Sequence, residues 1–176
     1  MKIFNNNKKG FTLVEMIIYI LIISLILVAI TYYAIDIIGA KTKAASYQEV
    51  QHNARFAMRR LVNEIRMADD LNASFSTFST HPGELSLSNN DSTKDPVFFD
   101  IKNERLRISQ GISGPYYLTS DNVRVTNLVF EDLSVTDRTK NIKISITVEH
   151  VNPENRNDFE ASVSMESTAV IREQED

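Results

Sequence analysis

The acidic residue whose position most strongly suggests chemistry is Glu15, which stands at the start of a long apolar run. Residues 16–35 read MIIYILIISLILVAITYYAI and contain no Asp, Glu, Lys, Arg or His. An unpaired carboxylate near the hydrocarbon edge of a membrane costs about 2–3 kcal/mol or more, so such a residue is by default a functional candidate. The alternative is that Glu15 lies among lipid headgroups, where its charge costs little.

The usual signatures of catalysis are missing from the sequence. His52, His81 and His150 have neither an H-E-x-x-H pattern nor a paired spacing, so they predict no zinc site. Without a G-x-S-x-G elbow, Ser113 is interpreted as a structural loop serine. The chain contains no cysteine, which excludes disulfides and thiolate chemistry. We expect a protein that is not an enzyme, with no catalytic residue, no metal and no cofactor.

One segment is rich in oxygen ligands. Asn89, Asn90, Asp91 and Asp95 could surround a calcium ion, but the D-x-[DN]-x-[DN]-G spacing is not met. We interpret the segment as a solvated loop, and a calcium site stays open as the alternative. The net charge of −4 argues against nucleic acid as a direct partner.

The apolar run is long enough to cross a bilayer. Twenty helical residues span about 30 Å, the thickness of the hydrocarbon core. Lys2, Lys8 and Lys9 precede the run without any acid. Positive flanks stay on the cytoplasmic side, so the C-terminal bulk is expected outside the cytoplasm.

An ordinary signal peptide does not fit this N-terminus. Its apolar stretch has about 7–15 residues and ends in an A-x-A-like site, whereas this run is longer and residues 29–31 and 34–36 are poor cleavage candidates. A plain signal anchor explains the length and the lysines, but it leaves Glu15 unexplained.

Residues 8–16, KKGFTLVEM, resemble the prepilin cleavage and methylation motif of type IV pilins and pseudopilins. The match comprises basic residues, Gly10, Phe11, a Thr-Leu-Val stretch and Glu15, followed directly by the apolar helix. The strong part of the resemblance covers residues 8–38.

The resemblance implies a processing site and an assembly site. A prepilin peptidase would cleave between Gly10 and Phe11, where glycine leaves the backbone open to close approach. Phe11 would become the N-methylated N-terminus, and the net charge would change from −4 to −7 because the leader contains three lysines and no acid. In the family, the carboxylate equivalent to Glu15 compensates the amine of a neighbour's first residue. Such pairing makes registry selective, because either charge left alone in a low-dielectric bundle is costly.

A single long helix is predicted from about residue 12 to about residue 70. Its second half is amphipathic, with a helical spacing of apolar residues, and its arginines are interpreted as a solvated face rather than a binding patch. Gly39 could permit a bend, since glycine weakens a helix by about 1 kcal/mol relative to alanine. The apolar stripe consists of Val50, Ala54, Ala57, Leu61, Ile65 and Ala68.

After His81-Pro82-Gly83 the hydrophobic period changes to two, which predicts β-strands. Lys102-Asn103-Glu104 predicts a hairpin turn, residues 72–80, 111–115, 137–141 and 152–158 predict loops, and Phe75 and Phe78 are expected to pack against the domain. The predicted strands are 84–88, 97–102, 105–110, 116–119, 123–133, 142–150 and 159–172.

The predicted fold class is α+β, with a long N-terminal helix packed on an antiparallel sheet. The expected organisation is a leader at 1–10, a transmembrane and polymerisation segment at 11–38, an amphipathic helix at 39–71 and a β-rich head at 72–176. This arrangement matches the general pilin architecture that the resemblance implies.

A weaker resemblance concerns subtype. Residues 53–68 and 167–172 are similar to minor pseudopilins of the J type of type II secretion and to W-type minor pilins. The family member that caps the tip typically lacks the glutamate, so the presence of Glu15 argues against that role.

Two classes of function remain. The first is a fibre subunit in the cytoplasmic membrane, with its head extracytoplasmic, which later enters a periplasmic or cell-surface fibre. Its partners would be other pilins or pseudopilins, prepilin peptidase, membrane lipid before assembly, and an assembly platform with a separate ATPase, since no Walker motif is present. The second is a solitary signal-anchored binding module. The mass of the mature chain distinguishes them.

Overall fold

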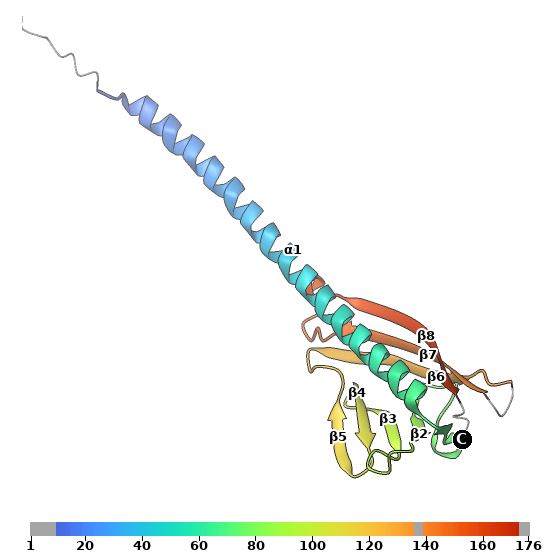
Figure 1. The fold of residues 1–176 in the computed structure, drawn as a ribbon. Coiled ribbons are helices and arrows are strands. Elements are labelled where there is room, and N and C mark those ends of the chain that lie inside the picture. The colour runs from blue at the N-terminus through green and yellow to red at the C-terminus, as the bar shows by residue number, and fades with distance from the viewer. Residues whose placement is uncertain (1–9, 136–138, 173–176) are drawn as a thin grey trace, which may run out of the picture. The chain divides into compact units, whose positions relative to one another are not determined.

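A computed structural model describes residues 10–135 and 139–172. The chain divides into two compact units, Met1–Lys41 and Thr42–Asp176. Helix α1 (Leu13–Met67) contributes to both and continues through Gly39 without interruption (Figure 1). The predicted long helix is therefore confirmed, and it begins and ends within three residues of the expected limits.

The part of α1 in the first unit is an apolar helix with an exposed surface. Its most hydrophobic 18-residue window has a mean hydropathy of 3.0 and no buried residue, so the helix is long and apolar enough to cross a membrane. Two hydroxyls in this stretch are satisfied within the helix, because Ser24 and Thr31 donate to the carbonyls of Leu21 and Leu27, each at 2.8 Å. Such internal bonding is what a lipid environment requires of polar groups.

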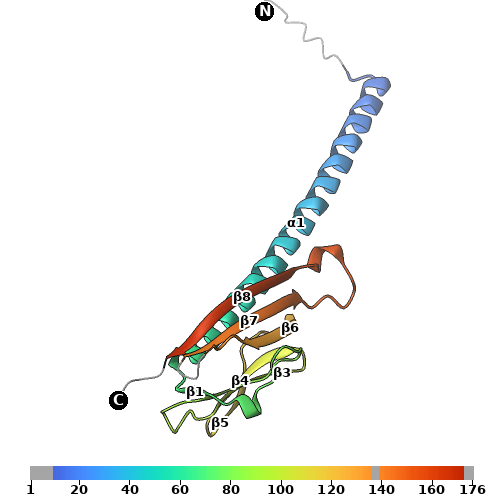
Figure 2. The ribbon, with the colours of Figure 1, turned by 90° about the vertical axis from the view of Figure 1, so that its right-hand side faces the viewer.

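The second unit contains two antiparallel sheets that flank the C-terminal part of α1 (Figures 1 and 2). The predicted α+β fold class is confirmed. The five-stranded sheet has the order β1 (Asp70–Leu71), β2 (Leu85–Ser88), β3 (Val97–Lys102), β4 (Arg105–Gln110) and β5 (Ser113–Tyr117). The three-stranded sheet has the order β6 (Val123–Asp132), β7 (Thr139–His150) and β8 (Ser162–Arg172).

Helix and sheets share one hydrophobic core. All six residues of the predicted stripe, from Val50 to Ala68, are buried in it. Phe99 from the first sheet and Phe130 from the second are completely buried beside them. In β7 the apolar residues alternate inward as predicted, and the buried ones are Ile142, Ile144, Ile146 and Val148.

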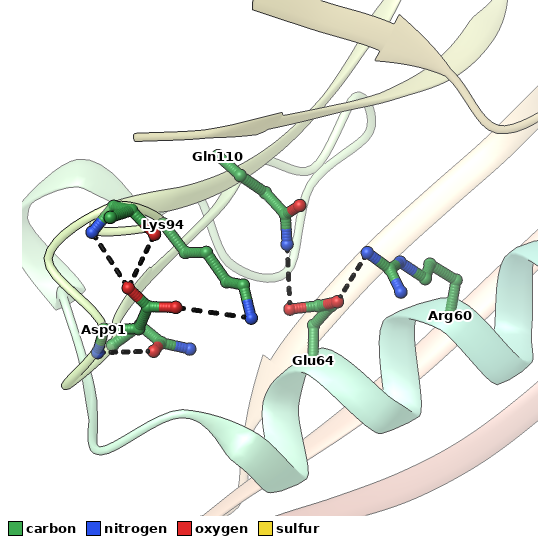
Figure 3. Close-up of polar contacts among 7 residues, drawn as sticks. Arg60, Glu64, Asp91, Lys94 and Gln110 are labelled. Carbon is green, nitrogen blue, oxygen red and sulfur yellow. Dashed lines mark hydrogen bonds and ion pairs between the residues drawn. The ribbon is translucent and has the colours of Figure 1, made fainter. Parts of the chain in front are cut away.

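A buried carboxylate ties α1 to the five-stranded sheet. The side chain of Glu64 is only 3% exposed, and its Oε1 lies 2.8 Å from an Arg60 guanidinium nitrogen. Its Oε2 accepts a hydrogen bond of 3.2 Å from the Gln110 amide in β4 (Figure 3). Arg60 also donates to the hydroxyl of Tyr116 in β5, at 3.3 Å. Helix, β4 and β5 are therefore joined by one polar network.

A second polar contact lies about two to four turns earlier on the helix. Asn53 Oδ1 accepts from the backbone N–H of Ser120, at 2.8 Å, and Glu49 Oε1 accepts from the Ser120 hydroxyl, at 3.0 Å. Ser120 precedes β6, so this contact fixes the connection between the sheets against α1.

The hairpins were predicted with mixed success. The turn at Asn103 and Glu104 is confirmed, and both residues adopt positive φ, at 53° and 58°. The predicted loop 111–115 and strand 116–119 were wrong in their limits, because β5 spans Ser113–Tyr117. Gly111, at φ +49°, turns the chain between β4 and β5, and a Cβ there would lie 2.2 Å from the Thr93 carbonyl oxygen. The tight turn leaves Ser113 free to resume pairing with Gln110.

Other limits also differ from prediction. The helix ends at Met67 rather than near 70 because Asp69 N–H donates to Ser88 O, at 3.0 Å, and the chain enters β1. Strand β7 starts at Thr139, inside the predicted loop 137–141, because its first residues pair with β8; residues 137 and 138 lie outside the described chain.

The strand predicted at 159–172 begins later than expected, and Phe75 does not pack on the core as predicted. Phe159 closes a 3-10 turn, so β8 begins at Ser162. Phe78 packs on the core as expected, whereas Phe75 is 73% exposed on the short 3-10 helix Ala73–Phe75. A 3-10 turn directs successive side chains around its axis, and here it leaves Phe75 outside the core.

A fragment beginning near Lys41 is expected to be soluble, folded and rich in β-structure. It retains the buried helix stripe and both sheets and omits the apolar segment. Far-ultraviolet circular dichroism with a cooperative thermal transition is the measurement. An unfolded fragment would contradict the packing of α1 on the sheets.

Candidate processing and assembly site

The predicted cleavage position lies in exposed backbone just before the helix. Gly10 is exposed, and a Cβ built on it would meet nothing within 4 Å. Phe11 is 71% exposed, and the helix begins only at Leu13. The Gly10–Phe11 peptide bond therefore lies in non-helical backbone that a protease can approach closely.

Thr12 caps the start of α1. Its hydroxyl oxygen accepts a hydrogen bond of 3.3 Å from the Glu15 N–H, and its carbonyl accepts one of 3.2 Å from the Met16 N–H. A threonine followed three residues later by glutamate is the sequence pattern of a capping box. The cap fixes Leu13 as the first residue of the helix, so Phe11 precedes the helix and Glu15 lies in its first turn.

Glu15 has a neutral partner in the described chain. Its Oε1 accepts a hydrogen bond of 3.4 Å from the hydroxyl of Tyr19, one helical turn further on. Within residues 10–135 and 139–172 no ion pair involves Glu15. The predicted pair of Glu15 with a Phe11 amine concerns a cleaved chain and its neighbour, and stays a prediction.

Phe11 and Glu15 are nevertheless brought together through a third residue. The rings of Phe11 and Tyr19 meet edge to face, with centroids 6.2 Å apart and an interplanar angle of 71°. Tyr19 thus contacts both predicted site residues. Neither Tyr19 nor Thr12 was predicted, although the T-x-x-E pattern and the four-residue spacing from Glu15 to Tyr19 are visible in the sequence.

The three histidines lie apart and make separate structural contacts. His52 lies on the surface of α1. His81 Nδ1 accepts a hydrogen bond of 2.9 Å from the N–H of buried Leu128, which joins the turn before β2 to β6. His150 stacks on Phe159, with ring centroids 5.5 Å apart. Ser113, the loop serine of the sequence analysis, is exposed at the start of β5.

The oxygen-rich loop is organised by its own donors. Asp91 Oδ1 accepts from the side chain and the backbone of Thr93, at 2.6 and 3.0 Å, and these bonds lower the pKa of the Asp91 carboxyl. Its other oxygen lies 3.4 Å from the Lys94 ammonium (Figure 3). Asp95 Oδ1 accepts from the Asn89 N–H, at 2.9 Å. Among the described residues, no three His, Cys, Asp or Glu side chains converge as metal ligands.

Comparison with known proteins shows that the residues of this site match one family model. Residues 5–31 match the family described as "Prokaryotic N-terminal methylation motif". Searches of curated proteins and of solved structures gave no match. The motif, joined to the long apolar helix, supports a type IV pilin-like or pseudopilin chain that is anchored in the membrane, processed by prepilin peptidase and assembled with other pilins.

Proposed function

We propose that this chain is a minor subunit of a type IV pilus or a type II secretion pseudopilus. The subunit crosses the cytoplasmic membrane once, with residues 1–10 on the cytoplasmic side and the β-rich head outside. Prepilin peptidase cleaves between Gly10 and Phe11, Phe11 is N-methylated, and residues 11–38 then join the helical core of a fibre. An assembly platform and a separate ATPase supply the work.

One observation carries this proposal, namely the methylation motif placed directly at the capped start of an exposed apolar helix. A transmembrane anchor needs only the apolar residues and the flanking lysines. It does not need a glycine in open backbone, an aromatic residue after it and a carboxylate four positions further on. A fibre subunit uses all of them.

The proposed pairing of charges gives Glu15 its role. Cleavage frees an amine at Phe11, and methylation leaves it basic. In a bundle of apolar helices, this cation and the Glu15 carboxylate of the adjacent subunit stabilise each other, whereas each alone is penalised. A subunit docked one turn out of register leaves both charges unpaired, so the pair selects one axial position.

The subtype rests on weaker similarities. Residues 53–68 and 167–172 resemble the J-type minor pseudopilins and the W-type minor pilins. The chain has Glu15, whereas the subunit that caps the tip typically lacks this glutamate. We propose a minor subunit beneath the tip rather than the cap itself.

The mature mass tests the proposal. Intact mass spectrometry of the membrane-extracted chain is expected to show loss of residues 1–10 and the gain of one methyl group. A full-length chain in cells that contain prepilin peptidase would favour the solitary signal-anchored binding module.

Gly10→Val is expected to abolish cleavage and leave the full-length chain in the membrane. A Cβ at Gly10 meets no atom of the described residues within 4 Å, so the change should disturb the peptidase and leave the subunit's own fold intact. The measurement is the ratio of uncleaved to cleaved chain on an immunoblot. Gly114→Val is the matched control, because Gly114 is equally open but lies in β5. Normal processing of Gly10→Val would refute the assigned bond.

A further inference from the structure

We propose that Tyr19 is a positioning residue for assembly, which holds the Glu15 carboxylate in place for the amine of the neighbouring subunit. This inference rests on the proposed function. It concerns Tyr19, which lies outside the KKGFTLVEM stretch of residues 8–16, and it follows from two contacts of one side chain.

The first contact is the hydrogen bond to Glu15. Residues four apart lie on the same face of a helix, and the Tyr19 hydroxyl reaches Oε1 at 3.4 Å. Within the described chain, Oε2 accepts no hydrogen bond from a protein donor. One oxygen is therefore held, and the other is left for a second donor. A carboxylate has about four acceptor sites, so it can keep the tyrosine and receive an ammonium group as well.

The second contact is with Phe11. The edge-to-face arrangement with Tyr19 is a favourable aromatic geometry, worth about 0.5–1.5 kcal/mol beyond buried area. Phe11 precedes the helix, and this ring contact links its side chain to α1. Tyr19 therefore contacts Glu15 and Phe11 of its own chain, whereas in the proposed pair Glu15 receives the amine of the neighbouring subunit's Phe11.

Other tyrosines of the apolar segment do not share this position. Tyr32 and Tyr33 are each 69% exposed, whereas Tyr19 is 48% exposed. Within the described chain no hydrogen bond or ring contact involves Tyr32 or Tyr33. Tyrosine as a lipid-interface residue would need no such contacts. The difference indicates a specific role for Tyr19.

The physical gain is twofold. Before assembly, the phenol satisfies one oxygen of a carboxylate that would otherwise stand beside hydrocarbon without a protein donor. During docking, the hydrogen bond to Tyr19 already restricts the Glu15 side chain, so less side-chain entropy is lost when the amine arrives. Tyr19 thus acts on assembly through Glu15. Assembly requires no direct contact between Tyr19 and the neighbouring subunit.

The test uses the full-length chain in cells that assemble the fibre. Tyr19→Phe keeps the ring and removes the hydroxyl, and Tyr32→Phe is the matched control in the same helix. Cleavage and membrane level are measured by immunoblot, and incorporation is the amount in sheared fibres divided by the membrane pool. We expect unchanged cleavage and a roughly three- to tenfold lower incorporation for Tyr19→Phe, the size of one ordinary intramolecular hydrogen bond. Tyr32→Phe should match the unsubstituted chain.

A double substitution separates positioning from simple packing. In a Glu15→Ala background, Tyr19→Phe is expected to lower incorporation by less than about twofold, because the group on which it acts is gone. Incorporation of Tyr19→Phe at the level of the unsubstituted chain would overturn the inference. A double variant whose loss of incorporation equals the product of the two single losses would overturn it as well. These results would leave the proposed function standing. An unsubstituted chain that is never cleaved would instead refute the proposed function, and this role with it.

Discussion

Glu15→Ala is expected to reduce incorporation into fibres by roughly two orders of magnitude, with leader cleavage and membrane insertion unchanged. The substitution leaves the partner's amine without its counter-charge inside the helix bundle. Breaking a buried ion pair costs about 3–5 kcal/mol, and each 1.4 kcal/mol is a factor of ten. The measurement is again the amount in sheared fibres relative to the membrane pool.

Two comparisons sharpen this result. Glu15→Asp keeps the charge with a shorter reach and should fall between alanine and the unsubstituted chain. Ser24→Ala, which removes a hydroxyl bonded only to its own helix, should have no effect. Undiminished incorporation of Glu15→Ala would show that the carboxylate sets no registry. It would then favour a subunit placed first at the tip, which has no subunit ahead of it.

Glu64→Ala is expected to lower the free energy of unfolding of the head by about 2–3 kcal/mol. The carboxylate is buried and serves both Arg60 and Gln110. Losing one partner of a buried pair costs about 3–5 kcal/mol, and we take a smaller value because the Arg60 side chain is 34% exposed and regains some hydration. For a domain of this size the melting temperature should fall by roughly 10 °C.

The fragment beginning near Lys41 is suited to this measurement by thermal and urea denaturation. Arg59→Ala is the matched control, since Arg59 lies on the exposed side of the same helix and bonds only to the carbonyl of Arg55. Its effect should stay within about 0.5 kcal/mol. Equal melting temperatures for the two variants would mean that the Glu64 network does not stabilise the contact between α1 and β4.

Much of the fold could be predicted because its pattern is strongly periodic. The buried stripe from Val50 to Ala68 follows the helical repeat, and Ile142 to Val148 follow the strand repeat. Such patterns identify which side of an element is buried. Strands β3 and β4 were predicted with their observed limits, because the Asn103–Glu104 turn separates two clear alternations.

The failures occurred where pairing with a distant segment overrides local pattern. Residues 113–115, Ser-Gly-Pro, have little strand propensity, yet they form β5 because β4 provides a partner. Asp70 and Leu71 have no strand signal of their own and pair with Ser88 and Leu87 of β2. The division of the strands into two sheets likewise depends on contacts that no single segment encodes.

The candidate site was only half predictable. Gly10, Phe11 and Glu15 were identified because their fixed spacing resembles a known motif. Tyr19 lies within an unbroken apolar run, where a tyrosine is most simply taken as a residue at the lipid interface. Its hydrogen bond to Glu15 and its ring contact with Phe11 depend on side-chain conformations that the residue pattern does not specify.

The position of Pro115 in β5 bears on how such subunits avoid associating through the edges of their sheets. β5 is the last strand of its sheet, and Pro115 lies where its pairing with β4 shifts register, between the pairs Ile108–Tyr116 and Gln110–Ser113. A proline in an edge strand and an irregular register both disfavour the addition of a further strand. Subunits are concentrated in a membrane before they assemble, and an open edge would invite amyloid-like stacking of their heads. The proline and the irregular register disfavour that route and leave the helix as the means of association.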